Sequence, residues 1–545
     1  MRNTTKSITG LAVLLVVGAA LHFFGGNIAD PDLWAHLQYG RAIFQGEGLP
    51  TVEVYSYTAA GAPFYDHEWL TDYLTAGVFD TFGATGLVVG KLLVLAAMLV
   101  LLIDTARVLG GLLGPGRNVH PLTAAAVLVL GLAVIGPGAT FRAQLFTMTF
   151  LALEGWLLTR AEVRARQEAN AARVTWEILV LPPLLLLWAN LHGGFLVGLG
   201  MFGLYAVSVG IQEIIALRTG RSVGEAVRRI GPFAVVCVAA VLAPIANPYG
   251  IELYTYLART LDMHGQISEW YPVALFSGHF LRFKIMVLLS ALGIAVVWPG
   301  WSEPRAPGAA WPAFAWRVAF YAFAAYMAFK HQRHTVLFGI VATPFLVVSM
   351  EQVRLLAVRR FPALRPRRPV FAVLAAGAAS VALFQVVGFA RQIDEHGGAI
   401  RYGRLDYPVD ALGFLTEHGF DGNLAMPFEW GAYAITKMAP ESRVFIDGRF
   451  EAVYPKQVID DYFAFMNGTA GWERLLDEYP TDIVVVQRWR NIHPRLFARD
   501  DLHYVYSDPA SLVFVRPGVR TDEALRRLAS VEDRNDFPRL ATYFP

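Results

Sequence analysis

The chain has 545 residues, of which 55% are hydrophobic and 17% charged, and its mean hydropathy is +0.43. An ordinary soluble domain is less apolar, so this composition argues against a soluble globular protein. The net charge of +2 is close to balance, so no overall basic field indicates nucleic acid as a partner. The single cysteine, Cys237, excludes an intrachain disulfide, a thiolate metal cluster and a CxxC redox pair.

Apolar runs long enough to cross a bilayer recur through the first 390 residues. Spanning the hydrocarbon takes about 20 apolar residues, and on this criterion we predict roughly eleven spans. The first is expected to be retained, because no clear small-residue cleavage pattern follows it. The predicted spans lie near residues 8–25, 84–106, 119–136, 144–159, 175–189, 194–215, 230–246, 283–298, 312–329, 335–351 and 370–390.

Basic residues gather in alternate connections between these runs. With eleven spans all the basic connections fall on one side, which the positive-inside rule makes cytoplasmic. The opposite side receives the loops 26–68 and 247–282 and everything after about residue 391, and in a bacterial inner membrane it is the periplasm. The basic connections are the N-terminus and those with Arg107 and Arg117; Arg160, Arg164, Arg166 and Arg173; Arg218, Arg221, Arg228 and Arg229; and Arg354, Arg359, Arg360, Arg365, Arg367 and Arg368.

Residues 391–545 have frequent charges and short apolar runs. Short β-like runs alternate there with helical patterns, which predicts a small soluble α/β domain on the extracytoplasmic side. We therefore expect a polytopic α-helical membrane domain over residues 1–390, followed by this domain. The expected strands are 423–427, 443–447, 482–487 and 512–516, and the expected helices include 409–418 and 472–479.

The first long loop opens with Asp-Pro-Asp-Leu-Trp-Ala-His over residues 30–36. Pro31 favours the start of a helix, on which Asp32 and His36 are four residues apart and share one face. A carboxylate and an imidazole can act as base and orienter, or as two ligands of a divalent metal ion. Either aspartate can instead cap the helix. Asp30 precedes Pro31 and suits the cap, which leaves Asp32 for chemistry.

The same loop ends with Tyr65-Asp66-His67-Glu68 before the chain returns to the membrane. A loop of about 40 residues without an obvious fold of its own is usually functional or disordered, and we favour function. Glu68 is therefore a further candidate for catalysis and His67 for substrate binding. Asp32, His36 and His67 are the candidate ligands if a divalent metal ion is bound.

Two shorter connections on the same side carry further candidates. Asn-Leu-His-Gly-Gly at residues 190–194 suits a tight turn between helices with a capping Asn190, but a turn does not explain His192, which we assign to substrate binding. Lys-His-Gln-Arg-His at residues 330–334 places cations where the sidedness rule expects few.

Cations at the membrane surface match a lipid phosphate, to which arginine gives bidentate hydrogen bonds. Contact with ordinary anionic head groups is the alternative. We assign Lys330, Arg333 and His334 to phosphate binding, with Arg142 as a weaker instance. Glu269 is either another carboxylate of the site or a solvated surface residue.

In the C-terminal domain, residues 428–431 and 444–449 stand at the ends of predicted strands, where α/β domains place groups that contact ligands. Asp447-Gly448 is at least as well explained as a turn. This part of the chain therefore contributes no residue to the predicted site.

Taken in order, these motifs resemble GT-C-type membrane glycosyltransferases of bacteria, distant relatives of the dolichyl-phosphate-mannose protein mannosyltransferases. The resemblance implies a GT-C-like fold, a polyprenyl-phosphate sugar donor, and a catalytic acid in the first extracytoplasmic loop. Asp32 is the best match for that acid and Asp30 the second, although the chain lacks the Asp-Glu pair of the mannosyltransferases. The motifs are residues 30–36, Tyr55–Thr58, 67–70, Asn-Leu-His-Gly-Gly, Ile-Ser-Glu-Trp, Lys-His-Gln-Arg-His and Phe-Ile-Asp-Gly-Arg.

The expected reaction is an inverting sugar transfer to an unidentified glycan, lipid or protein. Asp32 is the expected general base, supported by His36, His67 or Glu68 and by any divalent metal ion. The cations at residues 142, 330 and 333 are expected to hold the lipid phosphate. Two other classes stay open: a transporter or flippase of a lipid-linked saccharide, and a scaffold subunit of a glycan-assembly complex.

Overall fold

The computed structural model describes residues 2–46, 48–111, 119–167, 170, 172–260, 267–302, 310–361, 368–403 and 405–529. Residue contacts divide the chain into two compact units. Unit 1 comprises Met1–Gly26, Val89–Gly250 and His264–Gly397, and unit 2 comprises Asn27–Val88, Ile251–Met263 and Gly398–Pro545. Arg117, Arg365 and Arg367 of the predicted basic connections lie outside the described residues.

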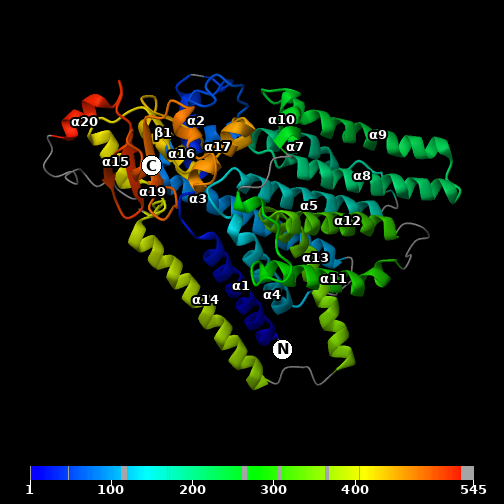
Figure 1. Ribbon diagram of the computed structural model, residues 1–545. Helices are drawn as coiled ribbons and strands as arrows, with labels where there is room; N and C mark the ends of the chain where they lie inside the picture. Colours follow the sequence, from blue (N-terminus) through cyan, green and yellow to red (C-terminus); the bar gives the residue numbers. More distant parts are fainter. Residues whose placement is uncertain are drawn as a thin grey trace. The chain divides into compact units, whose positions relative to one another are not determined.

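Unit 1 is helical (Figure 1), and each of the apolar runs predicted as a span overlaps one of its helices. Between α9 and the α10 of unit 2 the chain forms a short 3-10 turn, η2 (Ala243–Ala246). The helices are α1 (Arg2–Phe24), the C-terminal part of α3 (Trp69–Gly111), α4 (Pro121–Ile135), α5 (Gln144–Gln167), α6 (Trp176–Leu179), α7 (Leu181–Leu191), α8 (Phe195–Arg218), α9 (Val223–Leu242), α11 (Leu281–Ser302), α12 (Ala310–Lys330), α13 (Thr335–Arg360) and α14 (Arg368–His396).

Seven helices among the described residues are long and apolar enough to cross a membrane, so the chain is an integral membrane protein. The other predicted spans are helical but differ from that pattern. α7 has only 11 residues, and α5 carries charged residues along its second half. α11 and α12 adjoin the undescribed residues 303–309. The count of eleven spans stays a prediction.

Close helix packing in unit 1 depends on small residues. Helices α1 and α14 run side by side (Figure 1), and a Cβ atom added at Gly18 would lie 3.0 Å from Cα of Ala382. The amide of Gln392 in α14 donates to the carbonyl of Gly25, just after α1, at 3.1 Å. Small side chains let apolar helices approach closely where water supplies no driving force.

Unit 2 contains a five-stranded mixed sheet with the order β2-β1-β3-β5-β4. The four predicted strands are confirmed, and β4 is an additional strand that pairs with β5 antiparallel. β1 pairs with β2 and β3 in parallel. The strands are β1 (Asn423–Ala425), β2 (Arg443–Val444), β3 (Ile483–Gln487), β4 (His503–Ser507) and β5 (Ser511–Val515).

Helices surround this sheet in the C-terminal part of unit 2, and the helices predicted at 409–418 and 472–479 are present as α15 and α18. The first long loop contributes α2 (Pro31–Phe44) and the beginning of α3, and a separate segment contributes α10 (Glu252–Thr260). The remaining helices are α15 (Val409–Glu417), α16 (Phe428–Met438), α17 (Lys456–Asn467), α18 (Arg474–Asp477), α19 (His493–Phe497) and α20 (Asp522–Leu528).

The Tyr-Ser-Tyr-Thr segment of the first loop extends the sheet at its β2 edge. Ser56 forms a parallel bridge with Val444, because the Val444 N–H donates to Tyr55 (3.0 Å) and the Tyr57 N–H donates to Val444 (3.2 Å). The Thr58 hydroxyl donates to the Phe445 carbonyl at 2.5 Å. Strand edges bind extended segments in this way, so the first loop is fixed to the C-terminal sheet.

Helix α2 packs against the first turns of α3 at a glycine. A Cβ atom added at Gly40 would lie 2.1 Å from the Asp72 carbonyl oxygen and 2.7 Å from Cβ of Ala76. Any side chain at residue 40 would push the two helices apart, because backbone atoms cannot move aside independently. Gly40 therefore sets the distance between the residues that α2 and α3 present to each other.

We expect Gly40→Ala to destabilise unit 2 by about 1–3 kcal/mol, the usual cost of forcing extra volume into a packed contact. Thermal unfolding of the purified protein in detergent measures the effect as a lower midpoint. Gly90→Ala in the same helix α3 is the matched control, since a Cβ atom there meets nothing within 4 Å. Equal midpoints for the two variants would contradict the assigned packing.

Candidate active site

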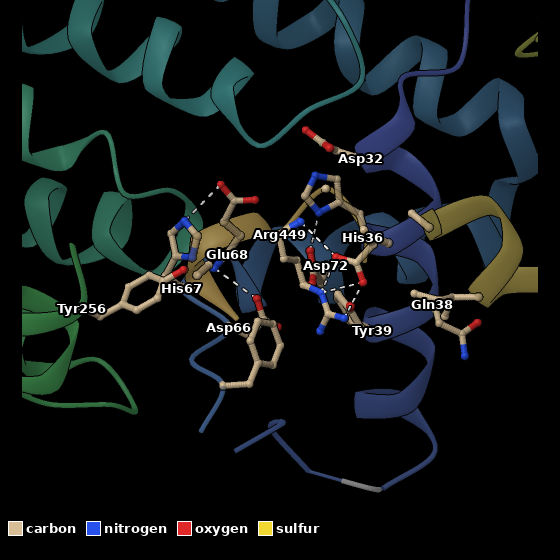
Figure 2. Close-up of a pocket in the computed structure, with 17 residues that line it drawn as sticks. Asp32, His36, Gln38, Tyr39, Asp66, His67, Glu68, Asp72, Tyr256 and Arg449 are labelled. Carbon is tan, nitrogen blue, oxygen red and sulfur yellow. Dashed lines mark hydrogen bonds and ion pairs between the residues drawn. The ribbon is translucent and has the colours of Figure 1, made fainter. Parts of the chain in front are cut away.

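A cavity of about 220 Å³ lies within unit 2. Figure 2 shows its polar lining, with α2 on one side and His67 and Tyr256 on the other. Acidic side chains dominate this lining, and one guanidinium is present. The lining residues are Asp32, Ala35, His36, Gln38, Tyr39, Phe64, Asp66, His67, Glu68, Asp72, Tyr256, Ala432, Ile435, Asp447, Gly448, Arg449 and Ala452.

The two aspartates at the start of α2 have different positions. Asp30 is the N-cap of α2, and its carboxylate accepts the backbone N–H of Asp32 at 3.1 Å, with Pro31 in the first helical turn. Asp32 lines the cavity, and its Oδ1 would lie 3.6 Å from a Cβ atom added at Gly448. The predicted division between a capping Asp30 and a cavity-facing Asp32 agrees with this geometry.

His36 lines the same cavity, one helical turn after Asp32. Its Nδ1 lies 2.5 Å from Oδ1 of Asp72, and the side chains of His36 and Asp72 are 7% and 2% exposed. Sequence reasoning missed Asp72, which belongs to the first turn of α3. The available signal was its position four residues after Glu68, which places both carboxylates on one face of that helix.

The segment Asp66-His67-Glu68 lines the cavity just before α3 begins. Burial, followed by the negative charges of Asp72 and Glu68, raises the pKa of Asp66 well above its usual value, and its carboxyl is hydrogen-bonded to Asp72. Asp66 is the second carboxyl of the lining that sequence reasoning missed.

His67 is neutral at physiological pH. Withdrawal from water, and to a smaller extent the charge of His36, lowers the pKa of His67 to about 4. Its Nε2 lies 3.5 Å from Oε1 of Glu68, too far for a good hydrogen bond. Its ring also packs against Tyr256 of α10, with 5.3 Å between ring centroids.

Arg449 is the cation of the cavity lining, and buried carboxylates hold it. Its Nε donates to Asp447 Oδ1 at 2.9 Å, and its Nη1 donates to Glu53 of the first loop. Burial alone would raise the pKa of Asp447, but the charge and hydrogen bonds of Arg449 outweigh burial and hold this pKa below its usual value. The Tyr454 hydroxyl donates to the same carboxylate at 3.0 Å.

The Asp447-Gly448-Arg449 segment therefore belongs to the cavity lining, where the sequence left a ligand-contacting strand end and a turn as alternatives. Its contribution depends on Glu53, which lies almost 400 positions earlier in the chain. No local pattern in the sequence signals a pair of that separation.

The side chains expected as metal ligands, Asp32, His36 and His67, line one cavity. Among the described residues, however, no three His, Cys, Asp or Glu side chains are placed to hold a metal ion, and Nδ1 of His36 is already engaged by Asp72. Metal binding stays a prediction from the sequence. The chemistry below uses side chains alone.

Several candidates from the other loops gather within unit 1. Arg142 Nη1 donates to Glu269 Oε1 at 2.8 Å, which pairs these two predicted residues with each other. The Arg333 guanidinium lies 4.8 Å from the ring centroid of Trp270, and the Gln332 N–H donates to the Tyr271 carbonyl at 3.0 Å. The Ile-Ser-Glu-Trp and Lys-His-Gln-Arg-His motifs therefore lie side by side.

Lys330 and Arg333 form no ion pair with any carboxylate of the described residues. His334 Nδ1 is 3.4 Å from the Met327 carbonyl, and its ring lies 6.1 Å from Trp270. In the part of the chain that the structure describes, Glu269 neutralises Arg142, whereas Lys330 and Arg333 have no such carboxylate.

His192 occupies the turn between α7 and α8. Its Nδ1 accepts the Gly194 N–H at 2.8 Å and lies 2.8 Å from the Thr147 hydroxyl, which in turn accepts Nε1–H of Trp188 at 2.8 Å. Because Nδ1 accepts the Gly194 N–H, the proton of a neutral ring is on Nε2. These contacts fix the ring in the turn, and the assignment of His192 to substrate binding stays a prediction.

The Arg449 network generates a stability prediction. Asp447→Asn leaves the buried Arg449 guanidinium with Glu53 as its remaining carboxylate. We therefore expect the free energy of unfolding to fall by about 3–5 kcal/mol, which is seen as a lower unfolding midpoint. Because folding lowers the pKa of Asp447, its contribution is present at neutral pH and is lost as the pH falls through the folded value. The acid sensitivity of the midpoint should therefore be smaller in the variant.

Asp80→Asn is the matched control, because Asp80 pairs with Arg41 at 2.8 Å while both side chains are more than one-third exposed. Ion pairs this exposed contribute under about 1 kcal/mol to the free energy of unfolding. A comparable loss in both variants would show that the Asp447–Arg449 pair is not buried in solution.

Comparison with known proteins gives matches among solved structures alone. No protein-family model and no curated protein matches the sequence. The chain is similar to ArnT from Cupriavidus metallidurans in the apo state, with 15% sequence identity, 93% of this chain and 98% of that chain covered, and a TM-score of 0.46. For the same protein bound to undecaprenyl phosphate the identity is 13%, the coverage 94% and 99%, and the TM-score 0.44.

The chain is also similar to the oligosaccharyltransferase of Archaeoglobus fulgidus in complex with zinc and sulfate. Here the identity is 12%, the coverage 93% of this chain and 73% of that chain, and the TM-score 0.48. These likenesses concern the course of the chain over most of its length and carry nothing about the reaction.

Proposed function

We propose that this chain is a GT-C-type membrane glycosyltransferase that moves a sugar from a polyprenyl-phosphate donor to a hydroxyl group of an acceptor. The reaction takes place on the extracytoplasmic side, which in a bacterial inner membrane is the periplasm. It proceeds by direct displacement, inverts the anomeric carbon and needs no covalent intermediate on the protein.

The cavity of unit 2 is the observation that supports this proposal. Asp32, His36, His67 and Glu68, which the sequence offers for sugar-transfer chemistry, line it together. Sugar transfer passes through a state in which positive charge develops on the anomeric carbon, and fixed negative charge stabilises that state. The acidic lining, in which Arg449 is already compensated by Asp447 and Glu53, suits this requirement.

Asp32 is the catalytic carboxylate of the proposal. It lies at the half-buried start of α2, where Asp30 and not Asp32 caps the helix. From this position its carboxylate lines the cavity, where it can act on the reacting carbon or, as the sequence predicts, on the proton of the acceptor. Glu68 is a second carboxylate of the same cavity, and His36 and His67 supply hydrogen bonds to sugar hydroxyls.

The departing polyprenyl phosphate needs compensation for its negative charge. Lys330 and Arg333 are proposed for this part, because no described carboxylate neutralises them and Arg333 is oriented by stacking on Trp270. Arg142 contributes less, since its charge is matched by Glu269. An arginine guanidinium binds phosphate oxygens bidentately.

Transport of a lipid-linked saccharide is the second candidate, and one buried acid favours it. Glu154 in the middle of α5 is fully buried, and its Oε2 would lie 2.6 Å from a Cβ atom added at Gly198 of α8. Ionisable residues inside membrane helices mark translocation paths in many proteins. The assay below separates transport from transfer.

Asp32→Asn is expected to lower sugar transfer by about a hundredfold or more, the usual contribution of a catalytic base or of a fixed charge at the reacting centre, while expression and membrane insertion stay at wild-type levels. The assay incubates purified full-length protein with undecaprenyl-phosphate hexoses labelled in the sugar and with a bacterial envelope extract as acceptor source. Near-normal transfer by this variant would remove Asp32 from the role. Movement of the intact donor across liposomes without transfer would support the transporter.

Asp30→Asn is the matched control one position before Pro31. Asparagine caps a helix as well as aspartate does, so transfer is expected near the wild-type rate. A large loss in Asp30→Asn with normal transfer in Asp32→Asn would reverse the two assignments.

Arg333→Gln is expected to weaken binding of undecaprenyl phosphate about tenfold, since a hydrogen bond to a charged group contributes about 1.5–3 kcal/mol. The dissociation constant is measured with the purified protein in detergent. Arg360→Gln is the control, because Arg360 also stacks on an aromatic ring, with 5.8 Å to the centroid of Phe361. Equal weakening in both variants would indicate nonspecific attraction.

A further inference from the structure

The two ring nitrogens of His36 have different surroundings within unit 2. Nδ1 lies 2.5 Å from Oδ1 of Asp72. Nε2 is buried and has no hydrogen-bond partner among the described residues, although the residue is only 6% exposed and lines the cavity beside Asp32. A buried polar atom without a partner at a cavity wall indicates a ligand that completes it.

Asp72 determines which nitrogen of His36 carries the proton. Asp72 is a hydrogen-bond partner of both His36 and Asp66. An ionised Asp72 can only accept, which places the hydrogen of the 2.5 Å contact with His36 on Nδ1. The lone pair of the neutral ring is then on Nε2, toward the cavity.

Within unit 2 this geometry is maintained by packing. The contact between α2 and α3 at Gly40 involves the backbone carbonyl of Asp72 itself. Asp72 is thus fixed to the helix that carries His36, and the His36 ring cannot turn without losing its partner. His67 does not duplicate the arrangement, because its nearest carboxylate, Glu68, is 3.5 Å away.

We propose that Nε2 of His36 takes the proton of the acceptor hydroxyl, and that Asp72 is the positioning residue that keeps this nitrogen unprotonated and aimed into the cavity. The proposal rests on the sugar-transfer function above and refines it. Asp32 then keeps its negative charge throughout the reaction and stabilises the positive charge at the anomeric carbon.

The step balances as follows. The acceptor oxygen forms a bond to the anomeric carbon while the bond from that carbon to the phosphate oxygen breaks, and the bonding pair leaves with the polyprenyl phosphate. The hydrogen of the acceptor hydroxyl moves to Nε2, which makes His36 an imidazolium paired with Asp72. His36 returns this proton to water or to the departing phosphate before the next turnover.

The first experiment compares two surrogate acceptors of similar size, ethanol and the more acidic trifluoroethanol, with labelled undecaprenyl-phosphate hexose as donor and full-length protein. In His36→Ala, transfer to ethanol is expected to fall about a hundredfold or more. Transfer to trifluoroethanol should fall several-fold less, because this alcohol gives up its proton more readily. Added imidazole should restore ethanol transfer in part.

His418→Ala is the control variant, since His418 lies outside the cavity lining and its Nδ1 is 3.0 Å from the Phe414 carbonyl. It should transfer to both alcohols at the wild-type rate. Equal losses with the two alcohols in His36→Ala, without rescue by imidazole, would overturn the proposal and leave sugar transfer itself intact.

The second experiment measures the tautomer of His36 by nitrogen-15 NMR of histidine-labelled protein and needs no acceptor. The neutral ring should carry its proton on Nδ1, and Asp72→Asn should shift the population toward Nε2–H and reduce ethanol transfer. If the neutral His36 ring of the wild-type protein carries its proton on Nε2, the proposal is wrong, whatever the result with the two alcohols. Failure of wild-type protein to transfer sugar from any donor would remove the proposed function and this proposal together.

Discussion

Buried negative charge is the constraint on which the arrangement of unit 2 depends. Removing a carboxylate from water costs several kcal/mol unless a proton, a cation or hydrogen-bond donors compensate it, and the acids around the cavity are compensated in different ways. Burial and neighbouring negative charge raise the pKa of Asp66, and Asp447 is paired with Arg449. Asp72 is held by His36. Acidic side chains still outnumber the single guanidinium in the lining.

These compensations require segments that are far apart in the sequence. The first loop supplies Glu53 to Arg449, and its Ser56 segment is bound to the edge of β2. The C-terminal domain therefore builds one wall of the cavity that the first loop begins. This gives a physical reason for the C-terminal sheet in the same chain as the apolar helices: the first loop is bound to the edge of that sheet.

Local rules were sufficient for part of this arrangement. Proline after an aspartate predicted the start of α2 with Asp30 as cap, and helical spacing predicted that Asp32 and His36 share a face. Apolar runs predicted four of the five strands. The partnership of His36 with Asp72 could not be predicted, because it depends on how closely α2 and α3 pack, which a single glycine decides. The position of Arg449 in the cavity lining likewise could not be predicted, because it depends on the ion pair with Glu53, which lies far away in the sequence.

An unfilled hydrogen-bonding site in a well-compensated environment is itself informative. Leaving a buried nitrogen without a partner costs about 1–3 kcal/mol, whereas Asp447 of the same cavity lining accepts several hydrogen bonds. A histidine with a purely structural part could be replaced by an apolar residue at lower cost. His36 instead has one nitrogen fixed and the other open toward the cavity, an arrangement whose cost is recovered when a hydroxyl group occupies that position.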